Sequence, residues 1–259
     1  NTGTGFYNTI TRRTASTCSS ATPTACITGS WDAGLNQDTG DANIKEGLLS
    51  SLANGKMLLA WKNNDDIKWR KCDSSCSTAG NWSAATDVVT NGVSTATSSK
   101  ISLISDRDGF AWLAYYDGTA IKAQRFVSSS NAWESAVIIS AAGTNPSIAL
   151  IENYVYVTDI ESTNILKIYR CKKDLTNCAL YRSLTGAETL YGPQLSRQPY
   201  RRSAALIFSE QGIEATSNQY RLSIWPFFSE WADKINNITT PAKIMGQSLF
   251  NLQSVNGVK

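Results

Sequence analysis

Acidic and basic side chains recur together along this chain, beside apolar stretches that repeat through it. An acid or amide follows the second apolar stretch of each repeating unit: Asn63, Asp117, Asp159 and Glu210. A basic residue comes near the start of the next stretch: Lys68, Lys122, Lys167 and Arg221. Such pairs could hydrogen-bond sugar hydroxyls, and the base could bind the carboxylate of an acidic sugar. The alternative is an ion pair or turn cap repeated in each unit, with little effect on stability.

Tyrosines near these pairs could stack on the apolar face of a sugar. Tyr115, Tyr116 and Tyr154 are placed for this role, although core packing is the usual role of such aromatic residues. We predict a ligand-binding set and no catalytic residue. The set comprises Asp117, Asp159, Glu210, Lys68, Lys122, Lys167, Arg221 and Tyr116. It favours an extracellular carbohydrate-binding (lectin-like) or adhesin module without catalytic activity.

A glycoside hydrolase is the first alternative function. It needs two carboxyl groups about 5 to 10 Å apart, and the candidates are Asp117, Asp159, Glu210 and Glu152. An active site breaks the symmetry of a repeat, however, whereas these acids follow it. The most asymmetric cluster is Tyr191, Arg197, Tyr200, Arg201 and Arg202. A protein-interaction or structural scaffold is the second alternative, because a fold does not fix a function.

The chain contains no histidine. This removes the commonest general base and the commonest zinc ligand, together with every Ser-His or Cys-His nucleophile pair. Acids at 106–108 and 38–41 could offer oxygens to Ca²⁺, but neither run has the ligand count of a loop site. We therefore expect no cofactor and no bound metal.

Six cysteines form three close pairs in the sequence: Cys18 with Cys26, Cys72 with Cys76, and Cys171 with Cys178. Zinc would need four soft ligands converging on one point, which this spacing does not offer. Disulfides are the better interpretation, and they favour an oxidising compartment such as the periplasm, the cell surface or the medium. We expect a secreted or cell-surface protein.

Bulky aromatic residues mark a repeat of about fifty residues. Trp31, Trp82, Trp133, Tyr181 and Trp231 are separated by 51, 51, 48 and 50 residues. A fixed period of this size is typical of repeat architectures. Each cysteine pair precedes one of these markers, whereas the unit of Trp133 has the plain loop 127–131 instead.

Each unit offers four strand-like stretches, here called A to D, separated by turn residues. Stretch A is 43–52, 100–105, 146–151 and 191–196; stretch B is 57–61, 110–116, 154–158 and 204–208; stretch C is 67–72, 121–126, 166–171 and 220–225. Stretch D begins at the marker, as in 133–140. Stretch B is nearly all apolar, as in a strand buried on both faces, and stretch C alternates. The pattern predicts an all-β fold, a β-propeller of five blades with four antiparallel strands each.

The two ends of the chain suggest how such a ring would close. Residues 7–13 with Trp31 resemble stretches C and D, and 249–257 resemble stretch A and its turn. One blade would then be shared by both termini, although its stretch B is hard to find. The alternative is a fragment of a larger six- or seven-bladed propeller. We expect a single domain over 1–259.

The unit 68–118 resembles the repeats of secreted bacterial β-propellers of the sialidase-like or lectin-like kind. The resemblance lies in a cysteine turn before Asn81-Trp82 and a glycine-aromatic turn at Gly109-Phe110. It implies a propeller fold and a surface or secreted setting. The sialidase Asp box, Ser-x-Asp-x-Gly-x-x-Trp, is not matched, because Arg107 stands in place of its aspartate.

Charge and composition limit the partners. The net charge is +3, and the basic residues are scattered rather than massed in one run, which argues against a nucleic-acid partner. No apolar run approaches the ~18 residues needed to cross a bilayer. We expect glycans or a cell-surface partner, no membrane insertion, and a chain that could belong to a longer protein.

Overall fold

A computed structural model describes residues 8–10, 35–37, 44–76, 78–96, 100–186 and 189–195, together with the strands that follow in the C-terminal part. The chain divides into two compact units, Asn1–Val93 and Ser94–Lys259. Each unit is described by itself. Whether both belong to one domain over 1–259 stays a prediction.

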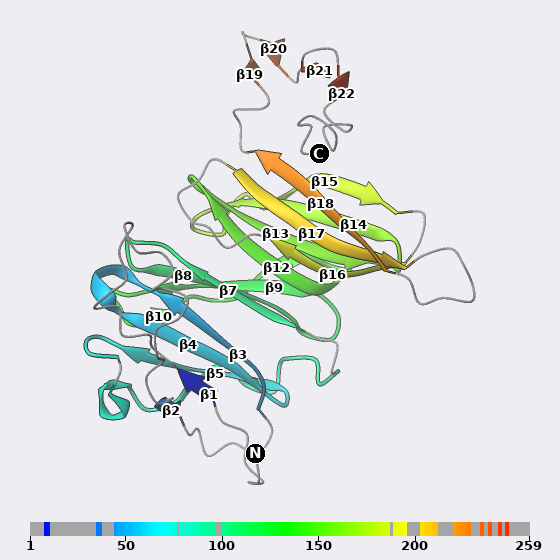
Figure 1. Ribbon diagram of the computed structural model, residues 1–259. Helices are drawn as coiled ribbons and strands as arrows, with labels where there is room; N and C mark the ends of the chain where they lie inside the picture. The colour runs from blue at the N-terminus through cyan, green and yellow to red at the C-terminus, as the bar shows by residue number, and fades with distance from the viewer. Residues whose placement is uncertain are drawn as a thin grey trace, which may run out of the picture. The chain divides into compact units, whose positions relative to one another are not determined.

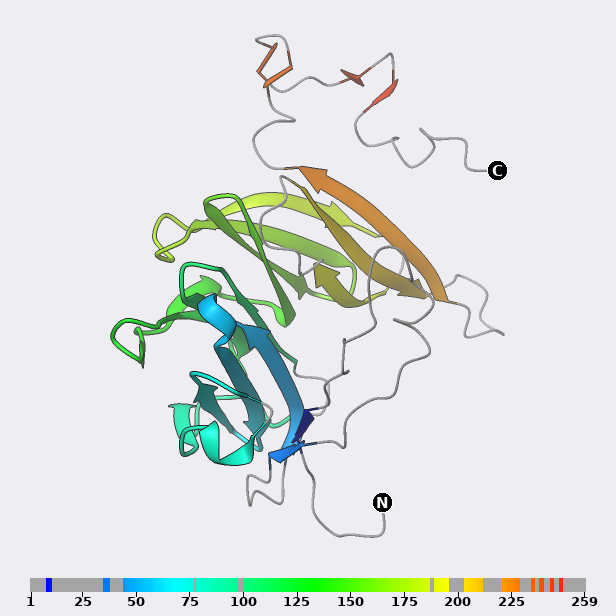
Figure 2. The ribbon, with the colours of Figure 1, turned by 60° about the vertical axis from the view of Figure 1, so that its left-hand side comes forward.

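The first unit is built on a four-stranded antiparallel sheet in the order β3-β4-β5-β6 (Figure 2). Its strands are β3 (Ile44–Ser51), β4 (Met57–Asn63), β5 (Asp66–Cys72) and β6 (Thr86–Val89). The short 3-10 turns η1 (Ala53–Gly55) and η2 (Ala79–Asn81) lie in its connections. A separate pair joins β1 (Asn8–Ile10) to β2 (Leu35–Gln37). A cluster of Leu59, Trp61, Cys72 and Trp82 packs on the sheet.

The second unit contains three antiparallel sheets (Figure 1). The first has β7 (Ile101–Ser105), β8 (Phe110–Tyr116), β9 (Ile121–Val127), β10 (Ala132–Trp133) and β11 (Val137–Ser140). The second has β12 (Thr144–Ile151), β13 (Tyr154–Glu161), β14 (Ile165–Lys172) and β15 (Ala179–Thr185). The third has β16 (Leu190–Leu195), β17 (Ser203–Gln211) and β18 (Tyr220–Phe228). Two small hairpins follow, β19 (Lys234–Ile235) with β20 (Ile238–Thr239) and β21 (Lys243–Ile244) with β22 (Gln247–Ser248).

The strand patterns predicted from the sequence are confirmed in these sheets. The interior of β8 is buried throughout, and the same is true of β4. In β14 buried and partly exposed positions alternate over most of its length. Stretch D is the least regular, because its strand in the first sheet of the second unit is split into β10 and β11, which both pair with β9.

The three sheets of the second unit pack against one another through two hydrophobic clusters. One lies between the sheets of β8 and β13 and includes Trp112 and Val157. The other lies between the sheets of β13 and β17 and includes Tyr156 and Leu206. The first strands of the sheets also bond directly: the Ile148 N–H donates to the Ser102 hydroxyl (3.1 Å), and the Leu195 N–H donates to the Ser147 hydroxyl (2.8 Å).

These two hydrogen bonds repeat one contact at successive sheets, because Ser102 and Ser147 both lie on stretch A. Since a buried N–H without a partner is costly, each serine satisfies a backbone group that the sheet ladder leaves open. The repeated serine thus helps to determine how neighbouring sheets pack on each other, in addition to the strands within each sheet.

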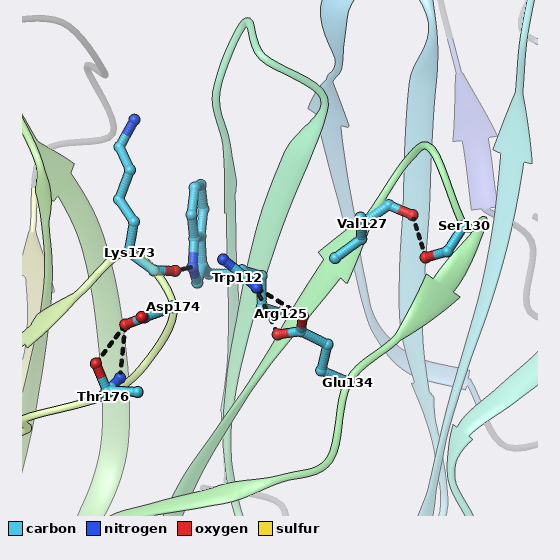
Figure 3. Close-up of polar contacts among 8 residues, drawn as sticks. All are labelled: Trp112, Arg125, Val127, Ser130, Glu134, Lys173, Asp174 and Thr176. Carbon is cyan, nitrogen blue, oxygen red and sulfur yellow. Dashed lines mark hydrogen bonds and ion pairs between the residues drawn. The ribbon is translucent and has the colours of Figure 1, made fainter.

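The A–B turn of one sheet meets the C–D loop of the next, as expected of propeller blades. The Trp112 indole N–H donates to the Lys173 carbonyl at 2.7 Å (Figure 3), and the Lys173 ammonium lies 3.3 Å from a carboxylate oxygen of Asp106. Asp106 is buried and also accepts N–H bonds from Asp108 and Phe110. Asp106 and Asp108 thus lie in a turn, and the Lys173 ammonium binds their carboxylate groups.

Replacing Lys173 with methionine is expected to destabilise the protein by about 1 to 2 kcal/mol. The buried Asp106 carboxylate would lose its cation and keep only two backbone donors, and charged hydrogen bonds contribute about this much. Urea unfolding of K173M at neutral pH measures the change. K172M is the matched control, because the neighbouring Lys172 side chain is exposed. Equal midpoints for K173M and wild type would contradict the role given to this contact.

Two predicted disulfides are confirmed, Cys72–Cys76 and Cys171–Cys178. The third pair, Cys18 and Cys26, lies outside the described residues. In the loop 127–131, which lacks cysteines, the Ser130 hydroxyl donates to the Val127 carbonyl at 3.2 Å and Asn131 adopts a positive φ of 53° (Figure 3). A hydrogen-bonded turn therefore replaces the disulfide in that sheet.

The all-β class and the four-stranded antiparallel sheets are confirmed. Ring closure is not observed, because 249–257 and most of the N-terminal segment lie outside the described residues. The same holds for the markers Trp31 and Trp231. Trp82 is buried and donates its indole N–H to the Cys76 carbonyl, so it packs on its disulfide loop. Trp133 packs on Phe126 and Tyr181 on Tyr156, as expected of packing anchors.

None of the helices in the described parts of the chain is long and apolar enough to cross a membrane.

Candidate functional site

Asp159 is a fully buried acid near the end of β13. It shares one face of the strand with Val155 and Val157, which belong to the cluster between the first two sheets of the second unit. Its cross-strand partner is Lys167 on β14. The side chain therefore lies at the end of an apolar interface, close to the loop that joins β11 to β12.

The surroundings of Asp159 favour its protonated form. Burial raises the pKa of Asp159 to about 6, and the charge of Glu161 adds to the rise. The Ser140 hydroxyl and the Lys167 ammonium lie close enough to oppose it in part. Within the described part of the chain, neither carboxylate oxygen has a partner of full hydrogen-bond geometry. A carboxyl with this pKa can give up or take a proton near neutral pH.

The backbone of Gly143 is packed directly against this carboxyl group. A Cβ atom at Gly143 would lie 2.0 Å from Oδ2 of Asp159 and 2.5 Å from its Cγ. Only glycine leaves room for the acid at this place. The preceding residues Ala141 and Ala142 are exposed, so the cover over Asp159 on this side is a thin loop of small residues.

Glu161 lies two residues beyond Asp159 and thus on the same face of β13. Its carboxylate forms an ion pair with the Lys167 ammonium, and the Glu161 side chain is 30% exposed. The pKa of Lys167 is raised, mainly by its hydrogen bond to Glu161. The ion pair places the Glu161 carboxylate at the surface beside Lys167, two residues beyond the buried carboxyl group of Asp159.

Asp117 has the opposite environment. Its carboxylate accepts bonds from the Thr119 and Ala120 N–H groups, both at 2.7 Å, and lies 2.6 Å from the Lys122 ammonium. Burial alone would raise the pKa of Asp117, but Lys122 and these N–H groups outweigh it and hold the pKa well below its usual range. Here the alternative interpretation, a turn cap with an ion pair, describes the contacts.

The strand registers correct the equivalence expected among the acids. Opposite the basic residue of stretch C stand Trp61, Tyr115, Asp159 and Glu210, facing Lys68, Lys122, Lys167 and Arg221. Asn63 and Asp117 lie two residues further along the chain than Trp61 and Tyr115 and correspond to Glu161. The acids thus do break the repeat, because aromatic residues occupy this position in two sheets and carboxylates in the other two.

The remaining predicted ligand-binding residues are placed as follows. Tyr116 donates its hydroxyl to the Gly118 carbonyl at 2.5 Å and packs against the core cluster. Burial and the charge of Asp117 raise the pKa of its neighbour Tyr115 to about 12. Lys68 pairs with Trp61 and Asp87 across its two neighbouring strands. Glu210 and Arg221 are described only by their backbone register.

Two further basic residues, Arg125 and Arg170, lie three positions beyond Lys122 and Lys167 on stretch C, and both make structural contacts. Arg125 forms a two-point ion pair with Glu134, with N to O distances of 2.8 and 2.6 Å (Figure 3). Arg170 lies over the ring of Tyr154, 4.8 Å from its centre. In the described ranges, no group of three or more Cys, Asp or Glu side chains is arranged to hold a metal ion.

Comparison with known proteins identifies similar structures but no family by sequence. No family model matches the chain, and no curated protein matches it. An exo-β-1,3-galactanase from Phanerochaete chrysosporium is similar at 11% identity and a TM-score of 0.42, over 67% of this chain and 43% of that one. A GH43 endo-arabinanase from Bacillus licheniformis is similar at 17% and 0.40, over 69% and 70%. A mutant of AofleA from Arthrobotrys oligospora is similar at 13% and 0.46, over 71% and 58%.

The match covers less than half the length of the galactanase. The GH43 glycoside hydrolases among these structures are five-bladed β-propellers. The sialidase-like or lectin-like part of the resemblance seen in the sequence is not confirmed.

The favoured function is corrected by these findings. A lectin-like or adhesin module without catalytic activity was expected, but the similar structures include a galactanase and an arabinanase, which are hydrolases of glycans. The lectin-like interpretation rested on acids that seemed to follow the repeat, whereas the strand registers break that equivalence. A cell-surface partner has no support either.

Proposed function

We propose that this chain is a glycoside hydrolase whose carboxyl pair is Asp159 and Glu161. The observation that carries the proposal is the contrast between these two acids on one face of β13. Burial makes Asp159 a carboxyl that keeps its proton to about pH 6, whereas Glu161 is partly exposed and forms an ion pair with Lys167. Two carboxyl groups in environments that separate their protonation are the usual arrangement of an acid and a base in glycosidases.

The spacing of the pair suits an inverting reaction. Residues two apart on a strand have Cα atoms about 6.8 Å apart, so the two side chains start far enough apart for the separation of about 6.5 to 9.5 Å between carboxyl groups that inverting glycosidases use. In this proposal the loop of Gly143, which closes over the fully buried Asp159 carboxyl group, moves aside when substrate binds, and Asp159 then donates its proton to the leaving glycosidic oxygen. Glu161 accepts a proton from the water that attacks the sugar from the other side.

A sugar would reach the pair from the side of Glu161. Glu161 and Lys167 lie at the surface, whereas Asp159, two residues earlier on β13, is fully buried. The loop of Ala141, Ala142 and Gly143 covers Asp159 without large side chains. Substrate therefore approaches at the end of the sheets that carries the B–C turns and D–A loops.

The complete fold, the partner and the location of the protein belong to the same proposal. A single five-bladed propeller over 1–259 is supported by the fifty-residue repeat and by the four-stranded sheets. The partner is a glycan substrate. Two disulfides in the described part of the chain favour an oxidising, secreted location.

Hydrolysis assays test the proposed function. Purified protein is incubated with galactan, arabinan, arabinoxylan and aryl glycosides, and released sugar is measured together with the anomer formed. We expect turnover with inversion, and a loss of at least about 100-fold in kcat for D159N and for E161Q, as for removal of a general acid or base. E134Q, which changes an acid in a structural ion pair, should keep wild-type turnover. Absence of turnover on all substrates, or full activity in both site variants, would overturn the proposal.

A further inference from the structure

The loop 141–143, which covers Asp159, is short and fixed at both ends. It joins β11 of the first sheet of the second unit to β12 of the second sheet. Its two alanines are exposed and its glycine is buried. Ser140 before the loop pairs with Ile121 on β9, and Thr144 after it pairs with Ile160 on β13. Any movement of the loop is therefore confined to three small residues.

Beneath the loop, the backbone of Gly143 lies directly on the carboxyl group of Asp159. A Cβ atom at Gly143 would be only 2.0 Å from Oδ2 of Asp159. The Asp159 residue is 0% exposed, and in the described part of the chain neither carboxyl oxygen has a hydrogen-bond partner. A carboxylate buried in this way is much less stable than a carboxyl group that keeps its proton, because the charge loses its hydration. The closed loop is therefore compatible with the neutral acid and opposes the charged one.

The titratable groups that face Asp159 come from three strands. They are Glu161 on β13, Lys167 and Tyr169 on β14, and Tyr116 on β8 of the facing sheet. The Lys167 ammonium is paired with Glu161, and the Asp117 carboxylate that follows Tyr116 is paired with Lys122. Residues 137–151, which form β11, the loop and β12, contain no charged side chain. The surroundings thus favour water, rather than a side chain, as the group that stabilises an ionised Asp159.

The loop is the thinnest barrier between this carboxyl group and water. Strand β13 lies between β12 and β14, so its two edges are paired. The apolar cluster that includes Val155 and Val157 closes the inner side. On the side of Glu161, the ion pair with Lys167 closes the approach. The loop 141–143, by contrast, covers Asp159 with backbone and methyl groups alone.

We infer that the loop 141–143 is a lid that opens when Asp159 loses its proton to water and closes when the proton returns. In the closed state the loop excludes water from the neutral acid, and in the open state the carboxylate is hydrated. Substrate opens the same loop in the proposed reaction, whereas ionisation opens it without substrate. The lid does not depend on the proposed function. Its use in hydrolysis does, because closure after each turnover favours return of the proton that Asp159 has donated.

Hydrogen-deuterium exchange of the purified protein at pH 5 and pH 8 tests the lid without any enzyme assay. Peptides that cover 139–146 are compared after correction for the chemical pH dependence of amide exchange. The pKa of Asp159 is about 6 in the closed state, and the ordinary value of 3.8 applies to a hydrated carboxyl group. The opening equilibrium should therefore rise about tenfold between the two pH values.

Two variants and one internal control accompany this measurement. D159N cannot ionise, so its corrected exchange over 139–146 should be the same at both pH values. K167M removes the cation that could turn from Glu161 to Asp159, and it should keep the rise. Peptides that cover the turn 127–131 of the first sheet should show no rise in wild type.

Equal corrected exchange over 139–146 at both pH values in wild type overturns the lid, because the charge would then be accommodated with the loop closed. A rise that persists in D159N, or that is equally large over 127–131, also overturns it, since the pH would then act elsewhere in the protein. The hydrolysis assays separate this result from the proposed function. A lid that opens with pH in a protein that hydrolyses no glycan stands by itself, and the proposed function falls.

Discussion

Asp159→Asn is expected to stabilise the protein at pH 7.5 while abolishing hydrolysis of glycans. Burial raises the pKa of Asp159 from 3.8 to about 6, so keeping this carboxylate charged in the folded state opposes folding. A difference of about two pH units corresponds to about 3 kcal/mol. Asparagine has nearly the same shape and no charge, although its unpartnered amide offsets part of the gain. A net increase of about 1 to 3 kcal/mol in the free energy of unfolding is expected.

The pH dependence gives the sign of this effect. The folded state binds the Asp159 proton more tightly than the unfolded state does, so the stability from this group is complete below about pH 4 and falls as the pH rises through 6. D159N lacks this fall. Its advantage over wild type in urea unfolding should therefore be small at pH 4 and reach its full size by pH 7.5. A variant that is less stable than wild type at both pH values would show that the carboxylate is not under strain.

Asp117→Asn provides the contrast at the same end of the neighbouring sheet. The pKa of Asp117 lies below its usual range despite its burial, because Lys122 and two N–H groups bind the charged form. This group contributes stability above its unfolded pKa that is lost as the pH falls. D117N should destabilise the protein at pH 7.5 by about 1 kcal/mol, since the amide oxygen can still accept both N–H bonds. Opposite signs in D117N and D159N would confirm that the two acids play different roles.

The sheets could be predicted from the sequence because their signals are local. A buried strand such as β8 reads as seven apolar residues between turn residues, and the alternation of β14 is visible in the same way. The disulfides at Cys72 and Cys171 were predictable because each partner lies within a few residues. The strand-like patterns at 7–13 and 249–257 suggested a closing blade, but they do not establish the pairing between segments so far apart in the sequence.

The candidate site could be predicted only in part. Asp159 and Lys167 were found because an acid and a base flank each B–C turn, but the turns differ in length. Alignment by sequence therefore placed Asp159 with Asp117, whereas the register aligns it with Tyr115. Glu161 was missed for the same reason.

Ser140 and Gly143 were missed for another reason. Each lies far from Asp159 in the sequence, and a serine and a glycine are ordinary residues of a strand or loop. One weak signal was present: Gly143 is a glycine at the end of stretch D, where the other residues of the loop are small as well. The reason for this glycine is its packing against the Asp159 side chain on the next hairpin, which the sequence does not reveal.

Gly143→Ala is expected to be among the most destabilising single-methyl additions in the second unit. The new Cβ atom would lie 2.0 Å from Oδ2 and 2.8 Å from Cβ of Asp159. The Asp159 side chain cannot retreat easily, because it lies on β13 between two paired strands and is fully buried. Overpacking of a closed site costs about 1 to 3 kcal/mol. Thermal or urea unfolding should show a loss at the upper end of this range.

A double-mutant cycle identifies the cause of that loss. Asp159→Ala removes the two closest atoms of the clash, Oδ2 and Cγ, and leaves only the Cβ contact at 2.8 Å, so G143A should cost less in the D159A background than in wild type. The coupling between the two substitutions should then amount to about 1 to 3 kcal/mol, as for residues in direct contact. G118A is a control for loss of glycine itself, since nothing lies within 4 Å of a Cβ at Gly118, although its φ of 103° adds backbone strain. Equal costs of G143A with and without the Asp159 carboxyl would show that the loop, rather than the buried acid, requires the glycine.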